Sequence, residues 1–204
     1  MKKENIIIFG AGGHAQSCID VIESTEKYKI VCLIDNDIKK RKILNIKVIK
    51  EKKKVSYYKN ISKNSFIGVG QIKSAKTRKK IFYQLKKAKY KLPKIISPNS
   101  YVSAHAKIGE GSIIMHGAII NSGVKIGRNC IINSRVLIEH NSIIKDNCHI
   151  STGAILNGGV EVGQDSFIGS NTVIKQEIKI GENSFVGFGL KIKKNVKKNE
   201  YITK

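Results

Sequence analysis

Acidic residues are scarce in this sequence of 204 residues. It has 15 Asp and Glu against 38 Lys and Arg, which gives a formal net charge of +23. Proline is also rare, with 2 residues, and 18 glycines are too few for a collagen-like or low-complexity chain. Because 41% of the residues are hydrophobic, the chain can form an apolar core. We therefore expect a basic, folded protein rather than a disordered or fibrous one.

Long apolar runs and paired cysteine motifs are missing too. No window approaches the roughly 18 uncharged apolar residues that a membrane helix needs, and the start MKKENIIIFGAGG lacks the apolar core of a signal peptide. We expect a cytoplasmic protein without a membrane span. The four cysteines show no C-x-x-C spacing, which argues against a zinc site and a disulfide framework, so we expect buried thiols and no metal: Cys18, Cys32, Cys130 and Cys148.

The charge divides the chain into two predicted domains, residues 1–94 and 95–204. The first carries 25 Lys and Arg against 7 acids, and the second 13 against 8. The first domain's positive residues are mostly lysines that spread over its whole length without interleaved arginine and aromatic residues, which favours a solvated surface over a specific nucleic-acid site. A non-catalytic or nucleic-acid-binding protein remains the alternative from another functional class.

The second domain repeats with a period of six. From Ile95 onward, 17 consecutive hexads have Ile, Val or Leu at their second position, and their sixth position is small or aliphatic. This period fits neither an exposed strand nor a helix, so each hexad is predicted to form a short strand and a corner. Three hexads make one triangular coil, which predicts an all-β, left-handed parallel β-helix. Glycine and asparagine at the third to fifth positions, such as Gly109, Gly127 and Asn129, are expected to adopt the left-handed backbone of corners.

The first domain begins with a strand, a glycine turn and a helix. An apolar run over residues 5–9 precedes Gly10, Gly12 and Gly13, and amphipathic residues follow. This order predicts a small α/β domain of Rossmann-like type, in which backbone N–H groups at a helix N-terminus could hold a phosphate. A mononucleotide or nucleotide-sugar is the favoured ligand. NAD and a ligand-free packing turn remain open.

Two histidines are candidates for chemistry. His14 follows the glycine turn, where it could lie over a bound phosphate or sugar or could be an exposed helix residue. His140 falls at a predicted corner between Glu139 and Asn141, where an oriented imidazole could act as a general base or could be exposed. Asp35 ends the second predicted strand, near the usual position of an acid that binds a ribose.

The segments GAGGH and SRVLIEHNSIIKDNCHISTGAILNGGV, in this order, resemble the bacterial sugar O- and N-acyltransferases of the sialic acid and bacillosamine pathways. The resemblance covers essentially the whole chain. It implies a homotrimer in which acetyl-CoA lies in the groove between adjacent β-helices and the first domain holds the nucleotide-sugar. The implied reaction transfers an acetyl group to an amine or hydroxyl of a sugar.

The resemblance also implies roles for single residues. His140 matches the general base, His149 a histidine near the acetyl group, Gly158 a glycine whose N–H contacts the thioester oxygen, and Asn133 an asparagine beside the acceptor. The residues that match the nucleotide-sugar site are Gly10, Gly12, Gly13, His14 and Asp35.

The expected reaction is N-acetylation of a UDP-linked 4-amino-4,6-dideoxy sugar, which His14 favours because that branch of the family has a similar glycine turn and histidine. The alternative is O-acetylation of sialic acid or a related nonulosonic acid, which the similarity around INSRVLIEH favours. The sequence departs from the family in two places. Asn141 stands where an acidic residue commonly follows the catalytic histidine, and the usual proline-containing C-terminal segment is missing.

Overall fold

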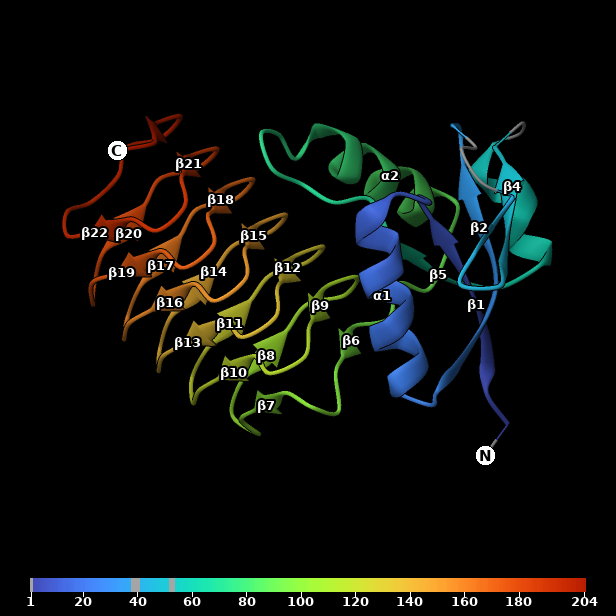
Figure 1. The fold of residues 1–204 in the computed structure, drawn as a ribbon, viewed down its shortest axis with the longest axis horizontal. Coiled ribbons are helices and arrows are strands. Elements are labelled where there is room, and N and C mark those ends of the chain that lie inside the picture. The colour runs from blue at the N-terminus through green and yellow to red at the C-terminus, as the bar shows by residue number, and fades with distance from the viewer. Residues whose placement is uncertain (1, 38–40, 52–53) are drawn as a thin grey trace. The chain divides into compact units, whose positions relative to one another are not determined.

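The computed structural model describes residues 2–37, 41–51 and 54–204, and the chain divides into two compact units (Figure 1). The first unit comprises residues 1–70 and 76–95, and the second comprises residues 71–75 and 96–204. The short segment 71–75 thus belongs with the second unit, although it lies within the predicted first domain. None of the helices in the described ranges is long and apolar enough to cross a bilayer.

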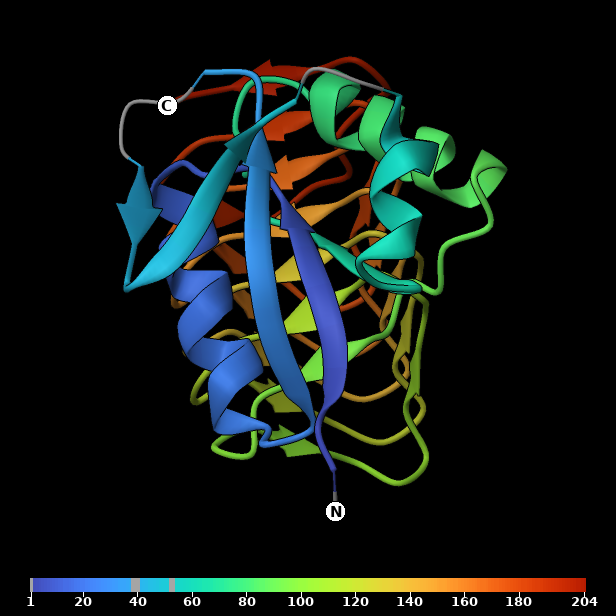
Figure 2. The same cartoon turned by 90° about the vertical axis from the view of Figure 1, so that its right-hand side faces the viewer.

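The first unit contains a five-stranded sheet with the order β3-β4-β2-β1-β5. Four strands are parallel, and β3 is antiparallel to its neighbour β4. Figure 2 shows β1 and β2 as two long blue arrows that run in the same direction. The strands are β1 (Glu4–Phe9), β2 (Tyr28–Asp35), β3 (Lys42–Ile43), β4 (Ile46–Lys50) and β5 (Asn64–Ile67).

Helices cover both faces of this sheet. Side chains alternate along β1, so Ile7 and Phe9 share a core with α2 (Lys76–Lys87) and the 3-10 helix η1 (Val55–Asn60). Ile8 lies on the other face, the side of α1 (Gly13–Ser24). These layers confirm the predicted Rossmann-like domain.

In the second unit each hexad forms one two-residue strand, and the strands stack into three parallel sheets, here named by their first strand. The strands of the β6 sheet are β6 (Ile95–Ile96), β9 (Ile113–Ile114), β12 (Ile131–Ile132), β15 (His149–Ile150), β18 (Phe167–Ile168), β21 (Phe185–Val186) and β23 (Tyr201–Ile202). Those of the β7 sheet are β7 (Tyr101–Val102), β10 (Ile119–Ile120), β13 (Leu137–Ile138), β16 (Ile155–Leu156), β19 (Val173–Ile174) and β22 (Lys191–Ile192). Those of the β8 sheet are β8 (Lys107–Ile108), β11 (Lys125–Ile126), β14 (Ile143–Ile144), β17 (Glu161–Val162) and β20 (Lys179–Ile180).

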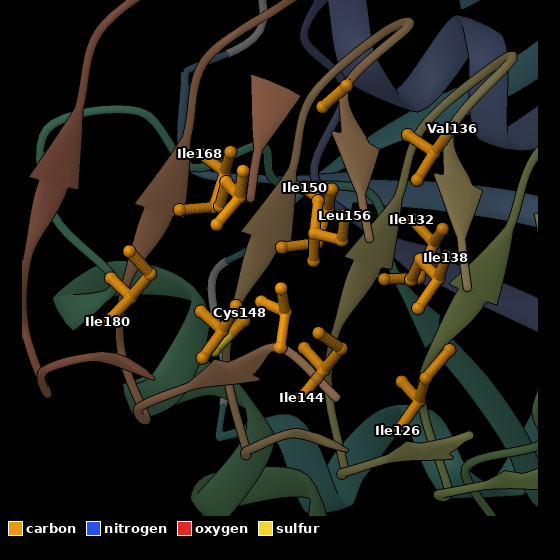
Figure 3. Packing of buried hydrophobic residues seen from close by; sticks show 14 of the residues in the cluster. Ile126, Ile132, Val136, Ile138, Ile144, Cys148, Ile150, Leu156, Ile168 and Ile180 are labelled. Carbon is orange, nitrogen blue, oxygen red and sulfur yellow. The ribbon is translucent and has the colours of Figure 1, made fainter. Parts of the chain in front are cut away.

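The second residue of each hexad points into the prism. Ile126, Ile132, Ile138 and Ile144 form part of one buried cluster and lie inside the coils in Figure 3. Paired residues lie one coil of three hexads apart, as in Ile131 opposite His149. This ladder confirms the predicted left-handed parallel β-helix. All four cysteines are buried free thiols.

Glycines at the third position of the hexads serve a different purpose from the one predicted, whereas glycines at the fifth position, such as Gly111 (φ 68°), have the predicted left-handed backbone. Left-handed backbone occurs at the fifth position of the hexad, at Asn129 (φ 56°) as expected and also at Arg135 (φ 58°) and Asn141 (φ 59°). Third-position glycines have ordinary dihedral angles. A Cβ at Gly109 would instead lie 2.5 Å from the backbone of the next coil, so the expectation of left-handed backbone at third-position glycines is wrong and close coil stacking is the reason for them.

Candidate active site

A groove of about 590 Å³ runs along the edge where the β7 sheet turns into the β8 sheet. Three stacked corners line it, because equivalent residues of successive coils lie one above the other. The lining residues are Glu139, His140 and Asn141 from one corner, Asn157, Gly158 and Gly159 from the next, and Gln176 and Glu177 from the third. The groove therefore brings together four of the residues singled out in the sequence: His140, its two neighbours and Gly158.

The imidazole of His140 lies against Gly158. A Cβ built on Gly158 would be 2.7 Å from both Cε1 and Nε2 of His140, so only glycine leaves room for the ring in this position. The carbonyl of Gly158 accepts a hydrogen bond from the N–H of Glu177 (2.9 Å). Among the described residues, no acceptor binds the N–H of Gly158. A donor on the backbone is thus available beside the imidazole.

Asn141, and not Glu139, contacts the ring of His140. The amide nitrogen Nδ2 of Asn141 lies 3.4 Å from His140 Nδ1. The carboxylate of Glu139 accepts a hydrogen bond from the amide of Asn121 on the preceding coil (2.8 Å). An amide can donate through nitrogen or, after a half-turn, accept through oxygen. Asn141 can therefore hold either tautomer of the imidazole, whereas a carboxylate would hold only the one with a proton on Nδ1.

His149 and Asn133 form a separate cluster on the β6 sheet. His149 is buried; its Nδ1 donates to the backbone carbonyl of Gln71, and its Nε2 lies 3.4 Å from the amide of Asn133. The side chain of Gln71 donates in turn to the carbonyl of Asn147 (2.9 Å). In a three-sided prism the β6 sheet lies opposite the edge that carries the groove, so one chain does not bring His149 and Asn133 to His140. No sequence signal pointed to Gln71, because it comes from a remote segment.

The glycine turn of the first unit is built as predicted. Gly10 has a φ of 109°, and a Cβ there would lie 2.8 Å from the side chain of Val69 and 2.9 Å from its backbone nitrogen. Gly12 is the N-cap of α1 and Gly13 its first residue. The carboxylate of Asp35 binds the turn itself, since it accepts the N–H of Ala11 (2.6 Å). The turn therefore depends on two features. Glycine at position 10 can adopt the positive φ, and the charged carboxylate of Asp35 accepts the N–H of Ala11.

His14 follows this turn and contacts Cys18. Its Nε2 lies 3.3 Å from the Sγ of Cys18. Burial raises the pKa of Cys18 to about 12, against a smaller lowering by the charge of Arg78. Cys18 therefore remains a thiol that can donate to Nε2. This contact favours the tautomer of His14 with its proton on Nδ1.

A second cavity, of about 480 Å³, lies within the first unit and was not predicted. It is lined by Asn36, Glu51, Lys54, Thr77, Lys80, Ile81 and Gln84. These residues come from the end of β2, from the segment after β4 and from α2, so no local motif could indicate them. Within the described ranges, no three His, Cys, Asp or Glu side chains gather as a possible metal site.

Three families match parts of the chain. The PglD N-terminal domain matches residues 5–85, and the bacterial transferase hexapeptide matches residues 105–140 and 141–176. A hexapeptide repeat of succinyl-transferase type also matches residues 159–194. The chain belongs to the hexapeptide-repeat transferases with a PglD-type N-terminal domain. This confirms the family expected from the sequence, and it makes the protein an enzyme of the transferase class. No curated protein matches this transferase.

Solved structures share the fold over nearly the whole transferase. A perosamine N-acetyltransferase mutant from Caulobacter crescentus, in complex with CoA and GDP-perosamine, has a TM-score of 0.90 and 24% identity, and the match covers 97% of this chain and 92% of that one. The acetyltransferase domain of PglB from Neisseria gonorrhoeae, in complex with acetyl coenzyme A, has a TM-score of 0.86 and 23% identity, covering 98% and 96%. WeeI from Acinetobacter baumannii has a TM-score of 0.84 and 22% identity, covering 99% and 97%.

Proposed function

We propose that the protein is an acetyl-CoA-dependent N-acetyltransferase of a nucleotide-linked amino sugar, with His140 as its general base. The observation that carries this proposal is the imidazole of His140 packed against Gly158 in a groove on the β-helix edge. Two similar folds support it, because they are described in complex with acetyl coenzyme A and with CoA and GDP-perosamine.

The groove offers the groups that acetyl transfer needs. Nε2 of His140 takes a proton from the sugar amine while the nitrogen adds to the thioester carbonyl. The carbonyl oxygen becomes negative, and the N–H of Gly158 donates to it. Collapse of this intermediate breaks the carbon–sulfur bond, and the proton on Nε2 of His140 passes to the departing sulfur, so the products are an amide and the thiol of CoA. Nε2 can accept a proton only if Nδ1 carries one, so the amide of Asn141 presents its oxygen to Nδ1 in this step.

The acceptor is proposed to be a 4-amino-4,6-dideoxy sugar, held through its nucleotide by Gly10, Gly12, Gly13, His14 and Asp35. Backbone N–H groups at the start of α1 suit a diphosphate. The resemblance to the family makes UDP the expected nucleotide. O-acetylation of sialic acid or a related nonulosonic acid is the alternative that the segment around His140 favours.

The protein is further proposed to act as a cytoplasmic homotrimer, in which His149 and Asn133 serve the acetyl group and the acceptor. The outward residues of the β7 sheet are apolar from Tyr101 (60% exposed) and Ile119 (42% exposed) to Val173. Those of the β8 sheet include Lys107, Lys125 and Lys179. An exposed apolar sheet face next to the groove is typical of a face that a second copy covers. A monomeric mass in solution would contradict this.

Release of the CoA thiol, followed with a thiol reagent, tests the activity. We expect release when acetyl-CoA is mixed with a nucleotide-linked 4-amino-4,6-dideoxy sugar, and product mass should rise by one acetyl group. Sialic acid is the second acceptor to be offered. Absence of thiol release with every amino sugar and nonulosonic acid tried would contradict both reactions.

A further inference from the structure

The second cavity combines charged, amide and apolar groups within the first unit. Glu51 contributes a carboxylate, Asn36 and Gln84 contribute amides, and Ile81 contributes an apolar surface, while Lys54 and Lys80 bring positive charge to the same lining. Its volume of about 480 Å³ lies within the range of small-molecule sites. A cavity with one apolar side chain and several hydrogen-bonding groups can hold a planar heterocycle.

This cavity adjoins the glycine turn through a single residue. Asp35 accepts the N–H of Ala11 in the turn with its carboxylate (2.6 Å), and its backbone carbonyl accepts the N–H of Glu51 (2.8 Å). Asn36, the next residue, lines the cavity. Both features therefore lie at the carboxyl edge of the sheet, where α/β domains bind their ligands. A nucleoside attached to a diphosphate at the turn can extend along this edge to the cavity.

The carboxylate of Glu51 is partly withdrawn from water. Burial raises its pKa, and the negative charge of Asp35 raises it further, while a hydrogen bond from Asn36 and the charge of Lys80 lower it. Its charge is therefore incompletely solvated, although Asn36 orients it. Hydrogen bonds from the N–H donors of a ligand therefore stabilise this carboxylate more than they would a fully hydrated one.

We propose that this cavity holds the nucleobase of the nucleotide-sugar and that Glu51 selects guanine. An ionised carboxylate only accepts hydrogen bonds, through two oxygens side by side. Guanine presents two adjacent donors, N1–H and the exocyclic N2–H, which pair with both oxygens. Uracil presents one N–H between two carbonyls, and cytosine and adenine each present one donor beside an acceptor. Any of these bases would set an acceptor against an oxygen of Glu51.

This assignment rests on the proposed function, because it identifies the nucleotide that carries the amino sugar. It differs from the UDP expected from the resemblance to the family. The distinction is chemical. A site whose two acceptor oxygens match a pair of donors on the base rejects a base that lacks one of these donors. Glu51 would thus be a specificity-determining residue rather than a catalytic one.

Binding of free nucleotides to the full chain tests the assignment without acetyl-CoA. Calorimetric titration with GDP, UDP, CDP and ADP should give a dissociation constant for GDP about tenfold or more below that for UDP. The substitution Glu51→Gln replaces one acceptor oxygen by a donor, so it should remove this preference by weakening GDP and not UDP. Glu23→Gln, an exposed position on α1, is the matched control and should leave the ratio unchanged.

The outcomes separate this proposal from the proposed function. UDP binding as tightly as GDP, or a ratio that survives Glu51→Gln, would overturn the assignment of guanine while leaving acetyl transfer intact. No binding of any nucleoside diphosphate would overturn the cavity as a nucleobase site. Thiol release with a nucleotide-linked sugar is measured separately and reports only on the acetyl transfer reaction. A circular dichroism spectrum of Glu51→Gln that matches the parent chain ensures that a lost preference reflects recognition.

Discussion

The third-position glycines of the β-helix and the two glycines that begin α1 serve opposite purposes. In the β-helix, a Cβ on Gly169 would lie 2.2 Å from the backbone carbonyl oxygen of Gly187 in the next coil. In the α/β unit, a Cβ on Gly12 or Gly13 would have no atom within 4 Å. The first kind of glycine is required by the packing of the fold. Packing does not require the second kind. The absence of a side chain there instead leaves room for a ligand to approach the backbone.

The largest effect should come from adding a methyl group in the β-helix. Gly169→Ala should lower the free energy of unfolding of this unit by about 3 kcal/mol or more, because two neighbouring coils must separate. Thermal unfolding followed by calorimetry measures this change. An unchanged transition would show that the coils can move apart and would remove the contrast between the units.

The second comparison sets the two candidate histidines against each other. His140→Ala should lower kcat about 100-fold or more, the usual effect of losing a general base. His14→Ala should instead raise KM for the nucleotide-sugar and leave kcat nearly unchanged. Steady-state kinetics with thiol detection separate the two effects. An undiminished kcat in His140→Ala would remove this residue from the mechanism.

The contact between Gly158 and His140 predicts a smaller effect. Gly158→Ala should lower kcat about tenfold. The new Cβ would lie 2.7 Å from Cε1 and Nε2 of His140, so the imidazole would have to move. A double-mutant cycle with His140→Ala measures whether the two changes are coupled. If the effect passes through the ring, Gly158→Ala should add nothing to the single His140→Ala variant.

The smallest effect on folding belongs to the glycine turn. Gly13→Ala should preserve the free energy of unfolding or raise it by up to about 1 kcal/mol, because alanine favours a helix over glycine. Nucleotide binding should nevertheless weaken several-fold, since the methyl group stands where the ligand would meet the turn. Calorimetry of unfolding and of nucleotide binding on the same variant tests both statements. Unchanged binding would mean that the ligand lies elsewhere.

Much of the fold could be predicted because its pattern is local. The hexads fix the inward residue of every strand, such as Ile132 and Ile150, whatever the rest of the chain does. The strand, glycine turn and helix around Gly10 are likewise contiguous. The corner that carries His140 and its two neighbours followed from the same repeat, since a fourth position always lies at a corner.

The parts that could not be predicted depend on residues that are remote in sequence. Gln71 contacts His149 from a segment that belongs to the second unit, and Glu51 and Gln84 line one cavity from different elements. The reason for third-position glycines was also missed, because it concerns the distance to the next coil rather than the dihedral angles of one residue. Periodicity describes neither kind of contact.

The sequence by itself determined that this chain forms a β-helix after a small α/β domain, because a repeat of six and a glycine turn between strand and helix restrict the backbone locally. Only the tertiary structure decided which side chains meet: that Asn141 rather than Glu139 contacts the imidazole of His140, and that Glu51 faces a cavity beside the turn. The physical reason is that hydrogen bonds and steric contacts act over a few ångströms in space, while the distance between their partners along the chain is set by the fold.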